Sequence, residues 1–497
     1  MSSVFDPEGT RLPIKVDSTS NGEFAPEPLP ERQIIGNAEA HKAVSEAAKR
    51  TGASRRNFLT SVCGAAATLA AFNAVNAKLG HTGGAYALDA EAPFDKAAAL
   101  NTLGKNEFIF DVQGHFVNPE GSWLEGLPDR IKPLSAFRGA NTCVAAALSE
   151  SDDGRDYLTC LNADSFVKDV FLDSDTDMMV LTFVPSAADR EPLTISEAEV
   201  TRKLIDSMEG NHRLLVHGRV NPNQAGDTDR MEMLAKDFNV SAFKTYTQWG
   251  PDGNGFSMAS EDVGIPFIER ARSLGVKNIA IHKGLPFSRT RSYEFSLSDD
   301  IGIVAAKYPD MNFLIYHSGF DQQVTENEFK AGSGKAGVDS LIQSLIDNGI
   351  GKHSNVYAEL GSTWRFLMRD PDQAAHVMGK LMKYMGEDNI LWGTDSIWYG
   401  SPQDQILAFR SFQISDEFQQ KYGYAPISAT AKAKIFGLNG AGVYGIKVPE
   451  VIKHASQDVI ANVRQLYAEA PDPHFNTYGP KNRREFMAFL RTEGEPR

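Results

Sequence analysis

The strongest constraint on this chain is the stretch Phe108-Ile109-Phe110-Asp111-Val112-Gln113-Gly114-His115, where an apolar run ends in polar residues. Side chains of a β-strand alternate between its two faces, so Gln113 and His115 are expected to leave a strand end on the same side. Later apolar runs end similarly, at His282, His317 and Asp395. A parallel β/α barrel gathers such residues at the C-terminal ends of its strands, and this arrangement is the starting hypothesis.

The remaining pattern agrees with an α/β fold, a (β/α)8 TIM barrel. Amphipathic helical segments lie between most of the predicted strands, and Ser196 with Glu199 predicts a helix-capping box. Residues 119–176 form a long insertion after the first strand, expected to cover the catalytic face. With fewer strands a doubly wound sheet would be favoured. The eight predicted strands are 107–112, 177–184, 213–220, 240–246, 278–283, 312–317, 355–360 and 388–394.

Composition excludes several classes of function. The formal net charge of −14 and the isoelectric point near 5.3 argue against nucleic acid or an anionic membrane as a partner. Three cysteines in 497 residues are too few for a disulfide scaffold or a cysteine zinc module. The expected partner is therefore a small-molecule substrate.

Both ends of the chain are expected to lie outside a barrel domain of residues 105–447. Residues 1–53 are rich in Pro, Ser, Glu and Asn and predict a disordered leader, and residues 448–497 predict a C-terminal helical extension with a polar tail.

Residues 54–87 resemble a twin-arginine (Tat) export signal, because Arg55 and Arg56 precede a short, weakly hydrophobic run. The resemblance implies the Tat machinery as a partner and an exported, periplasmic protein. Cleavage is expected after Ala77 or Ala87, where small residues precede the site. The alternative is an ordinary buried helix flanked by basic residues.

Taken together, the motifs resemble the amidohydrolase superfamily, specifically the amidohydrolase-related branch that includes aminocarboxymuconate-semialdehyde decarboxylase. The resemblance covers residues 105–447 and rests on the order and spacing of short motifs. These motifs are Asp111-Val-Gln-Gly-His115, Phe243-Lys244-Thr-Tyr246, Ile281-His282-Lys283-Gly284, Tyr316-His317-Ser318-Gly319-Phe320, Trp392-Gly393-Thr394-Asp395-Ser396 and Leu438-Asn439-Gly440-Ala441.

The resemblance implies one divalent metal ion, with zinc expected and manganese as the alternative. In this family a His-x-His pair on the first strand binds the ion; here His115 is the second member, but Gln113 replaces the first. His282 and Asp395 complete the implied ligand set. A glutamine oxygen is a neutral ligand, poorer than imidazole for zinc. The alternative is a barrel without metal, in which Gln113 only forms hydrogen bonds.

The same resemblance makes His317 the general acid or base, with Asp395 sharing its two oxygens between metal and proton. A substrate with a planar carboxylated or aromatic group would suit the polar and aromatic residues expected near the mouth. Besides binding a substrate anion, Lys244 could be a carbamylated lysine that bridges two metals, or part of an ion pair inside the barrel. His217 is expected to be a pocket wall or internally bonded. The predicted substrate-binding residues are Lys244, Tyr246, Arg289 and Trp398.

Three functions follow from these residues. The first is an exported metal-dependent hydrolase in which His317 and the ion activate water. The second is a metal-dependent, non-oxidative decarboxylase of an aromatic or muconate-like acid. The third is a non-catalytic binding protein whose barrel has lost its activity. The only support for it is that Gln113 replaces the family's histidine. Such barrels commonly dimerise through their outer helices, so a homodimer is one expectation, although no surface stripe indicates it.

Overall fold

The computed structural model describes residues 12–124, 160–209, 213–250, 253–286, 292–332, 334–469, 471, 473, 475, 477–483 and 486–487. Most of the predicted insertion after the first strand lies outside these residues. Arg289 lies outside them too.

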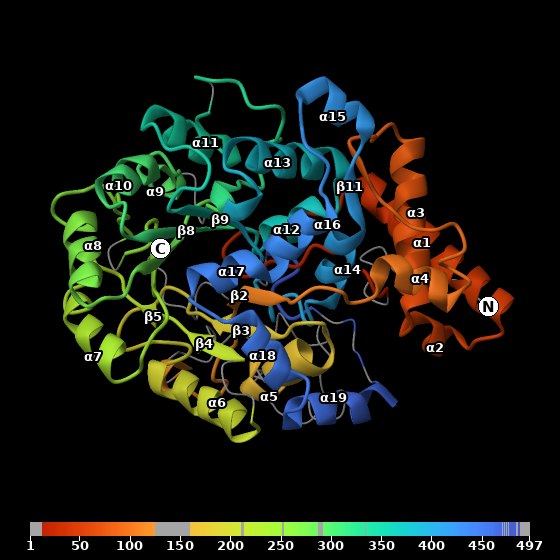
Figure 1. Cartoon of the computed structure of the whole chain (residues 1–497), viewed down its shortest axis with the longest axis horizontal. Helices are drawn as coiled ribbons and strands as arrows, with labels where there is room; N and C mark the ends of the chain where they lie inside the picture. Colours follow the sequence, from red (N-terminus) through yellow and green to blue (C-terminus); the bar gives the residue numbers. More distant parts are fainter. Residues whose placement is uncertain are drawn as a thin grey trace.

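Parallel strands form the centre of the fold (Figure 1). Every predicted barrel strand is present. Two of the strand segments are halves of one predicted strand, divided at His217. The strands are β2 (Phe110–Gly114), β3 (Met178–Leu181), β4 (Leu214–Val216) with β5 (Gly218–Arg219), β6 (Phe243–Tyr246), β7 (Asn278–His282), β8 (Asn312–Tyr316), β9 (Val356–Glu359) and β10 (Ile390–Leu391).

Two sheets, β2-β3-β4 and β5-β6-β7-β8-β9-β10, join through backbone hydrogen bonds. At one junction the His217 amide donates to the Leu181 carbonyl at 3.1 Å, and the Gly218 amide donates to Ala242 at 2.9 Å. At the other, the Val112 amide donates to the Trp392 carbonyl at 3.0 Å, which links the first strand to the last. The chain therefore folds as a TIM barrel of the α/β class.

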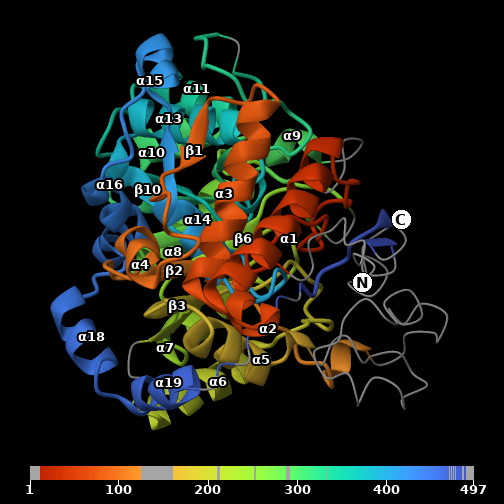
Figure 2. The same cartoon turned by 90° about the vertical axis from the view of Figure 1, so that its right-hand side faces the viewer.

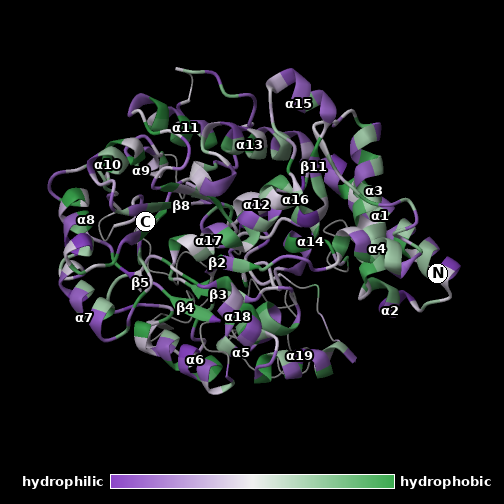
Figure 3. Ribbon diagram, in the orientation of Figure 1, coloured by the Kyte–Doolittle hydropathy of each residue, from purple (hydrophilic) through white to green (hydrophobic). Residues whose placement is uncertain are grey.

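Helices surround these strands (Figure 1), and alternate strand residues pack against them. On β7, Ile279 and Ile281 belong to the large core cluster that also contains the buried residues of the helices, whereas Ala280 belongs to the core inside the barrel. Figure 3 shows the hydrophobic residues concentrated on the inner strands. The barrel helices are α5 (Ala163–Val167), α6 (Ile195–Ser207), α7 (Met231–Lys236), α8 (Gly264–Ser273), α9 (Tyr293–Ser296), α10 (Ile301–Lys307), α11 (Val338–Asp347), α12 (Thr363–Leu367), α13 (Pro371–Tyr384) and α14 (Gln403–Ser411).

The predicted capping box is wrong by two residues. Helix α6 is capped by Thr194, whose hydroxyl accepts from the Glu197 amide while the Glu197 carboxylate accepts from the Thr194 amide. The spacing of a capping box was recognised, but Ser196 already lies inside the helix.

The expected disordered leader is wrong for residues 12–53. Residues 12–24 are nearly all buried, with Leu12 and Ile14 fully inaccessible to solvent, and residues 31–51 form a helix. This segment and the helices after it lie against one side of the barrel (Figure 2). The N-terminal elements are α1 (Glu31–Thr51), α2 (Arg55–Leu59), α3 (Val62–Lys78), β1 (Gly84–Tyr86) and α4 (Lys96–Leu103).

The signal-like stretch contains α2 and α3. Both Arg55 and Arg56 are exposed, whereas most of α3 is buried and packs on α1. No helix in the described part of the chain is long and apolar enough to cross a membrane.

The chain after the barrel is mainly helical and returns to the N-terminal segment. Thr477 accepts a hydrogen bond from Thr19 at 2.7 Å, and the Ser20 amide donates to the Pro480 carbonyl at 2.8 Å. The two ends of the described chain therefore hold each other in place. The C-terminal elements are β11 (Phe412–Ile414), α15 (Asp416–Tyr422), α16 (Ala429–Ala433), α17 (Asn439–Val443), α18 (Val448–Ala455) and α19 (Val459–Glu469), with β11 antiparallel to β1.

The pH dependence of stability tests the environment of Asp169, a buried carboxyl group that contacts the C-terminal segment. Its carboxylate accepts a hydrogen bond from the Tyr478 hydroxyl at 3.0 Å, and burial raises the pKa of Asp169 to about 7. The folded protein therefore binds a proton that the unfolded chain releases near pH 4, so the unfolding free energy falls as pH rises from 4 to 7. Asp169→Asn, which has no charge to bury, is expected to stabilise the protein at pH 8 by up to about 4 kcal/mol.

Thermal unfolding of both proteins between pH 5 and 8 checks this prediction. The melting temperature of the wild type should fall more steeply across this range than that of Asp169→Asn. Parallel curves would contradict it, because the titration of Asp169 would then not contribute.

Candidate active site

Three side chains from the first and last barrel strands meet at the C-terminal end of the barrel. Gln113 Nε2 donates to Asp395 Oδ1 at 3.0 Å, His115 Nε2 lies 3.1 Å from the same oxygen, and Gln113 Nε2 lies 3.4 Å from His115 Nε2. All three residues are almost completely buried. His115 Nε2 and Asp395 Oδ1 are close enough to bind the same ion at the usual ligand distances of about 2.0–2.2 Å, whereas Gln113 presents its donor nitrogen to them and could bind an ion only through Oε1.

An irregularity in β2 directs the Gln113 side chain toward this site. The register between β2 and β3 shifts between Asp111 and Gly114, so the simple alternation expected of the strand does not hold there. Phe110 and Val112 already lie in the core inside the barrel. The predicted proximity of Gln113 and His115 is therefore confirmed, but a bulge produces it, as is common where a strand ends beside a functional site.

A second cluster combines two barrel histidines with a glutamate from the N-terminal segment. Glu23 Oε1 lies 3.2 Å from His282 Nδ1, and Glu23 Oε2 lies 3.5 Å from His317 Nε2. The ligating atoms of these buried residues all lie within 4.8 Å of one another. The cluster is therefore a candidate His/Glu metal site.

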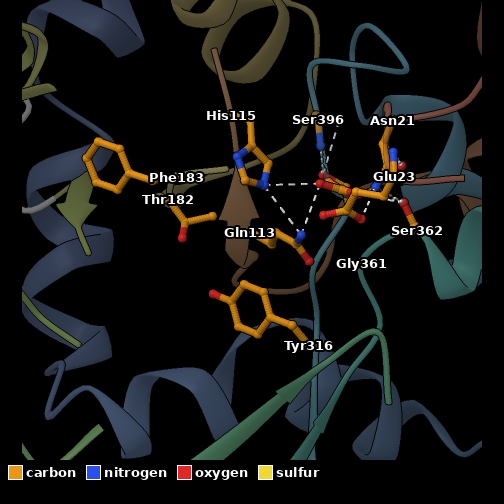
Figure 4. A network of polar contacts seen from close by, with 12 residues as sticks. Asn21, Glu23, Gln113, His115, Thr182, Phe183, Tyr316, Gly361, Ser362 and Ser396 are labelled. Atoms are coloured by element: carbon orange, nitrogen blue, oxygen red, sulfur yellow. Dashed lines mark hydrogen bonds and ion pairs between the residues drawn. The ribbon is translucent and has the colours of Figure 1, made fainter. Parts of the chain in front are cut away.

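Asn21 joins the two clusters. Its Nδ2 donates to Asp395 Oδ2 at 2.6 Å and also to Glu23 Oε2. Ser362 Oγ donates to the same Asp395 oxygen at 2.5 Å. Figure 4 shows Asn21 and Glu23 in one network with Gln113 and His115. The two clusters and Asn21 together form one polar centre. Its residues come from the N-terminal segment as well as from the barrel strands.

The two predicted catalytic residues have left-handed backbone conformations. The φ angle is +66° at His317 and +59° at Asp395. These conformations are uncommon for residues other than glycine and cluster at functional sites. His317 directly follows Tyr316, whose side chain lies inside the barrel, so regular alternation would direct His317 outward. The left-handed turn directs its imidazole to the centre instead.

Glu359, at the end of β9, fixes the loop that carries His317. Its carboxylate accepts from the His317 amide at 3.0 Å and from the Gly361 amide at 2.6 Å. Gly361 must lack a side chain, because a Cβ there would lie 2.0 Å from Gln113 Oε1. The carbonyl of Gly361 in turn accepts from His317 Nδ1 at 2.7 Å. Glu359 is thus a positioning residue rather than a ligand.

Burial determines the charges of the centre. It lowers the pKa of His317 to about 4, that of Lys244 to about 7, and that of His282 well below its usual value. For Asp395, burial acts to raise the pKa, but the hydrogen bond and charge of His115 outweigh it and hold the pKa below its usual range. The imidazoles of His282 and His317 are thus neutral beside the ionised Asp395 carboxylate, which is the protonation state that metal ligands require.

The predicted substrate-binding residues have different environments. Lys244 Nζ lies 3.7 Å from the centroid of the Tyr316 ring and, among the described residues, has no hydrogen-bond partner and no ion pair. Tyr246 stacks on His282 with ring centroids 4.7 Å apart, and its hydroxyl donates to the Phe183 carbonyl at 3.1 Å. The ring of Trp398 lies 6.0 Å from that of His115.

His217 is internally bonded, as one of its two interpretations expected. Its Nδ1 lies 3.1 Å from the Thr182 hydroxyl and its Nε2 lies 2.9 Å from the Tyr444 hydroxyl. Both ring nitrogens are engaged, so His217 does not serve as a ligand here.

Sequence reasoning missed Asn21, Glu23 and Ser362. The first two fall in the segment expected to be disordered, and nothing in the local sequence distinguishes them. The alternation of Leu12, Ile14 and Val16 was the available signal, since all three are buried. That signal predicts an extended buried segment, but not which polar residue beyond it reaches the site.

A parallel barrel with histidines and carboxylates gathered at the C-terminal ends of its strands has the architecture of a metal-dependent TIM-barrel enzyme. The sequence profile described as "Amidohydrolase" matches residues 167–446, which is more than half of the chain. The chain therefore belongs to the amidohydrolase family, whose superfamily generally binds a divalent metal. No curated protein matches the chain.

Solved structures with similar folds include an uncharacterised TIM-barrel protein from Bordetella bronchiseptica, 12% identical, with a TM-score of 0.39 over 70% of this chain and 99% of that one. The 5-carboxyvanillate decarboxylase from Sphingomonas paucimobilis is also 12% identical, with a TM-score of 0.39 over 69% and 100%. The 2,6-dihydroxybenzoate decarboxylase from Rhizobium is 12% identical, with a TM-score of 0.37 over 68% and 99%.

Proposed function

We propose that this protein is a metal-dependent hydrolase of the amidohydrolase superfamily. The observation that carries the proposal is the convergence of the Gln113, His115 and Asp395 side-chain atoms within 3.0–3.4 Å of one another, with His282 and His317 beside them. The residues fit a divalent ion, because neutral imidazole and carboxylate suit zinc or manganese. Gln113 can also contribute, since its Oε1 accepts no hydrogen bond from the residues that the structure describes and a half-turn of the amide exchanges it with Nε2.

Each residue has a defined task in this proposal. His115, His282 and Asp395 would hold the ion, which polarises a substrate carbonyl and makes water more acidic. His317 accepts the proton from the attacking water, because its Nδ1–H is engaged with the Gly361 carbonyl and Nε2 presents a lone pair toward the centre. Lys244 has a cationic group available for an anionic group of the substrate.

A second candidate is a non-oxidative decarboxylase, and Lys244 is the observation that favours it. Burial without a hydrogen-bond partner in the described chain lowers the pKa of Lys244 to about 7, and a bound substrate carboxylate would stabilise its ammonium form. Decarboxylation would need His317 to donate a proton to carbon, whereas hydrolysis needs it to accept one from water.

Metal content is the primary test. Protein purified without chelator is expected to contain about one equivalent of zinc or manganese. His282→Ala and Asp395→Ala should each reduce that content at least tenfold without loss of secondary structure. Elemental analysis and circular dichroism measure both quantities. No metal in the wild type, even after reconstitution, would overturn the proposed function.

The reaction type is tested separately once a carboxylated ester, amide or lactone is turned over. Hydrolysis incorporates oxygen from isotopically labelled water into the product. Decarboxylation releases carbon dioxide and incorporates a solvent proton at carbon.

Export through the Tat pathway to a periplasm is also proposed, on sequence evidence together with the exposure of Arg55 and Arg56. Cleavage after Ala77 or Ala87 would remove the segment that contains Asn21 and Glu23. Such cleavage is incompatible with a role for Glu23 in the mature enzyme, so the position of the mature N-terminus decides between the two.

A further inference from the structure

We infer that Glu23, in the N-terminal segment, is a metal ligand of the working enzyme and provides the second carboxylate that the barrel strands lack. This inference rests on the proposed metal-dependent function. The barrel contributes one carboxylate to the ligand set, Asp395, since Gln113 is neutral and both oxygens of Glu359 accept from backbone amides. A divalent ion among these groups would keep an unbalanced positive charge in a buried site, which is costly.

The orientation of the two histidines supports a cation beside Glu23. The His282 Nε2–H is directed at the Gly284 carbonyl at 3.1 Å, and the His317 Nδ1–H at the Gly361 carbonyl at 2.7 Å. A carbonyl oxygen can only accept, so in the neutral rings the other nitrogens present lone pairs. Those nitrogens face the Glu23 oxygens at 3.2 and 3.5 Å. Acceptors directed at one another are stabilised by a positive charge between them, and a divalent ion would supply it.

The role of each Glu23 oxygen follows from its neighbours. Oε1 lies beside His282 Nδ1, so the two atoms can bind one ion together. Oε2 faces His317 Nε2, which has no hydrogen bond within the described part of the chain, so Oε2 can accept one once His317 has gained a proton. Asn21 holds this arrangement, because its amide contacts both Glu23 and Asp395.

The segment is anchored on both sides of Glu23, which argues that it is a permanent part of the fold. Before Glu23, Asp17 forms a 2.8 Å ion pair with the buried Arg365, and Lys15 Nζ donates to the Tyr399 carbonyl at 2.6 Å. After it, Phe24 packs on Phe366 with ring centroids 4.8 Å apart. Withdrawal of the segment would break this buried ion pair and leave Arg365 with Asp404 alone.

Glu23→Gln tests the inference, because glutamine keeps the shape of the side chain and removes its charge. Its dissociation constant for zinc, titrated into metal-free protein by calorimetry, is expected to rise tenfold or more. Zinc should also raise the melting temperature of the wild type more than that of the variant. Glu27→Gln is the matched control, since Glu27 lies in the same segment but is exposed, and its zinc affinity should equal that of the wild type.

The outcomes separate this inference from the proposed function. If the wild type binds zinc and Glu23→Gln binds it equally well, Glu23 is not a ligand while the metal-dependent function stands. If the wild type binds none, the proposed function fails first. Unchanged zinc affinity with increased turnover in Glu23→Gln would overturn the inference in favour of a segment that blocks the site.

Mass spectrometry of the active protein recovered from cells provides a second test. The inference expects residue 23 to be present in the active form. Full metal content and activity in a chain that begins after Ala77 or Ala87 would overturn it.

Discussion

Replacing His317 with glutamine is expected to lower kcat by about 100-fold or more, because glutamine cannot take up the proton that hydrolysis releases. Glutamine can still donate to the Gly361 carbonyl, the contact that now orients the imidazole through Nδ1. The loop should therefore keep its position, held by the Glu359 carboxylate on the residue 317 amide. Steady-state kinetics on the substrate found by screening would measure kcat and KM, and KM should change little.

Metal content decides how such a loss of activity is interpreted. His317→Gln is expected to retain about one equivalent of metal, because the ion is held by His115, His282 and Asp395 with Glu23. Loss of metal together with activity would contradict the role of His317 as a base and make it a third member of the Glu23 and His282 ligand group. His376→Gln is the matched control, since His376 lies on α13 and bonds to Tyr424, outside the polar centre.

Arg365→Met is expected to produce the largest loss of stability. Arg365 is fully buried and pairs with Asp17 at 2.8 Å and Asp404 at 3.3 Å. Methionine fills similar space but leaves both carboxylates buried without their arginine, so the unfolding free energy should fall by about 3–5 kcal/mol. Denaturant and thermal unfolding measure the loss, and limited proteolysis should reveal earlier cleavage in the N-terminal segment.

A surface arginine provides the comparison. Arg272 pairs with Asp310 at 2.7 Å, but about half of each side chain is exposed. Arg272→Met should therefore leave the unfolding free energy almost unchanged, because solvent screens an exposed ion pair. Equal effects of the two substitutions would contradict the argument that Arg365 anchors the N-terminal segment through buried charge.

Much of the barrel could be predicted because its signals are local. Each strand is a short apolar run, and buried parallel strands have that pattern whatever surrounds them. The residues directly after those runs, among them His282 and Asp395, could be placed at one end of the barrel because parallel strands all finish there. The capping-box spacing is also a local signal, although the prediction placed the cap at Ser196, two residues after Thr194.

The rest of the site depends on contacts that no local pattern encodes. Asn21 meets Asp395 across 374 positions of sequence, and Ser362 meets it across 33. The turn of His317 into the centre requires a backbone conformation that a histidine seldom adopts, so strand periodicity could not predict it. Polar composition indicated disorder for the N-terminal segment, yet its charged residues are buried because Arg365 and Asp404 pair with them.

The hydrogen bond between Thr19 and Thr477 spans 458 residues, so the order of protein synthesis limits when the site can form. At about 5–20 residues per second, a ribosome needs roughly 20 to 90 s to make the chain between these two threonines. Glu23 leaves the ribosome early. Its contacts form only after the barrel strands have been made, and the C-terminal segment that packs on the N-terminal segment follows later still. Barrel strands can pair while the chain is growing, whereas the hydrogen bond that links Thr19 to Thr477 can form only after residue 477 has been made.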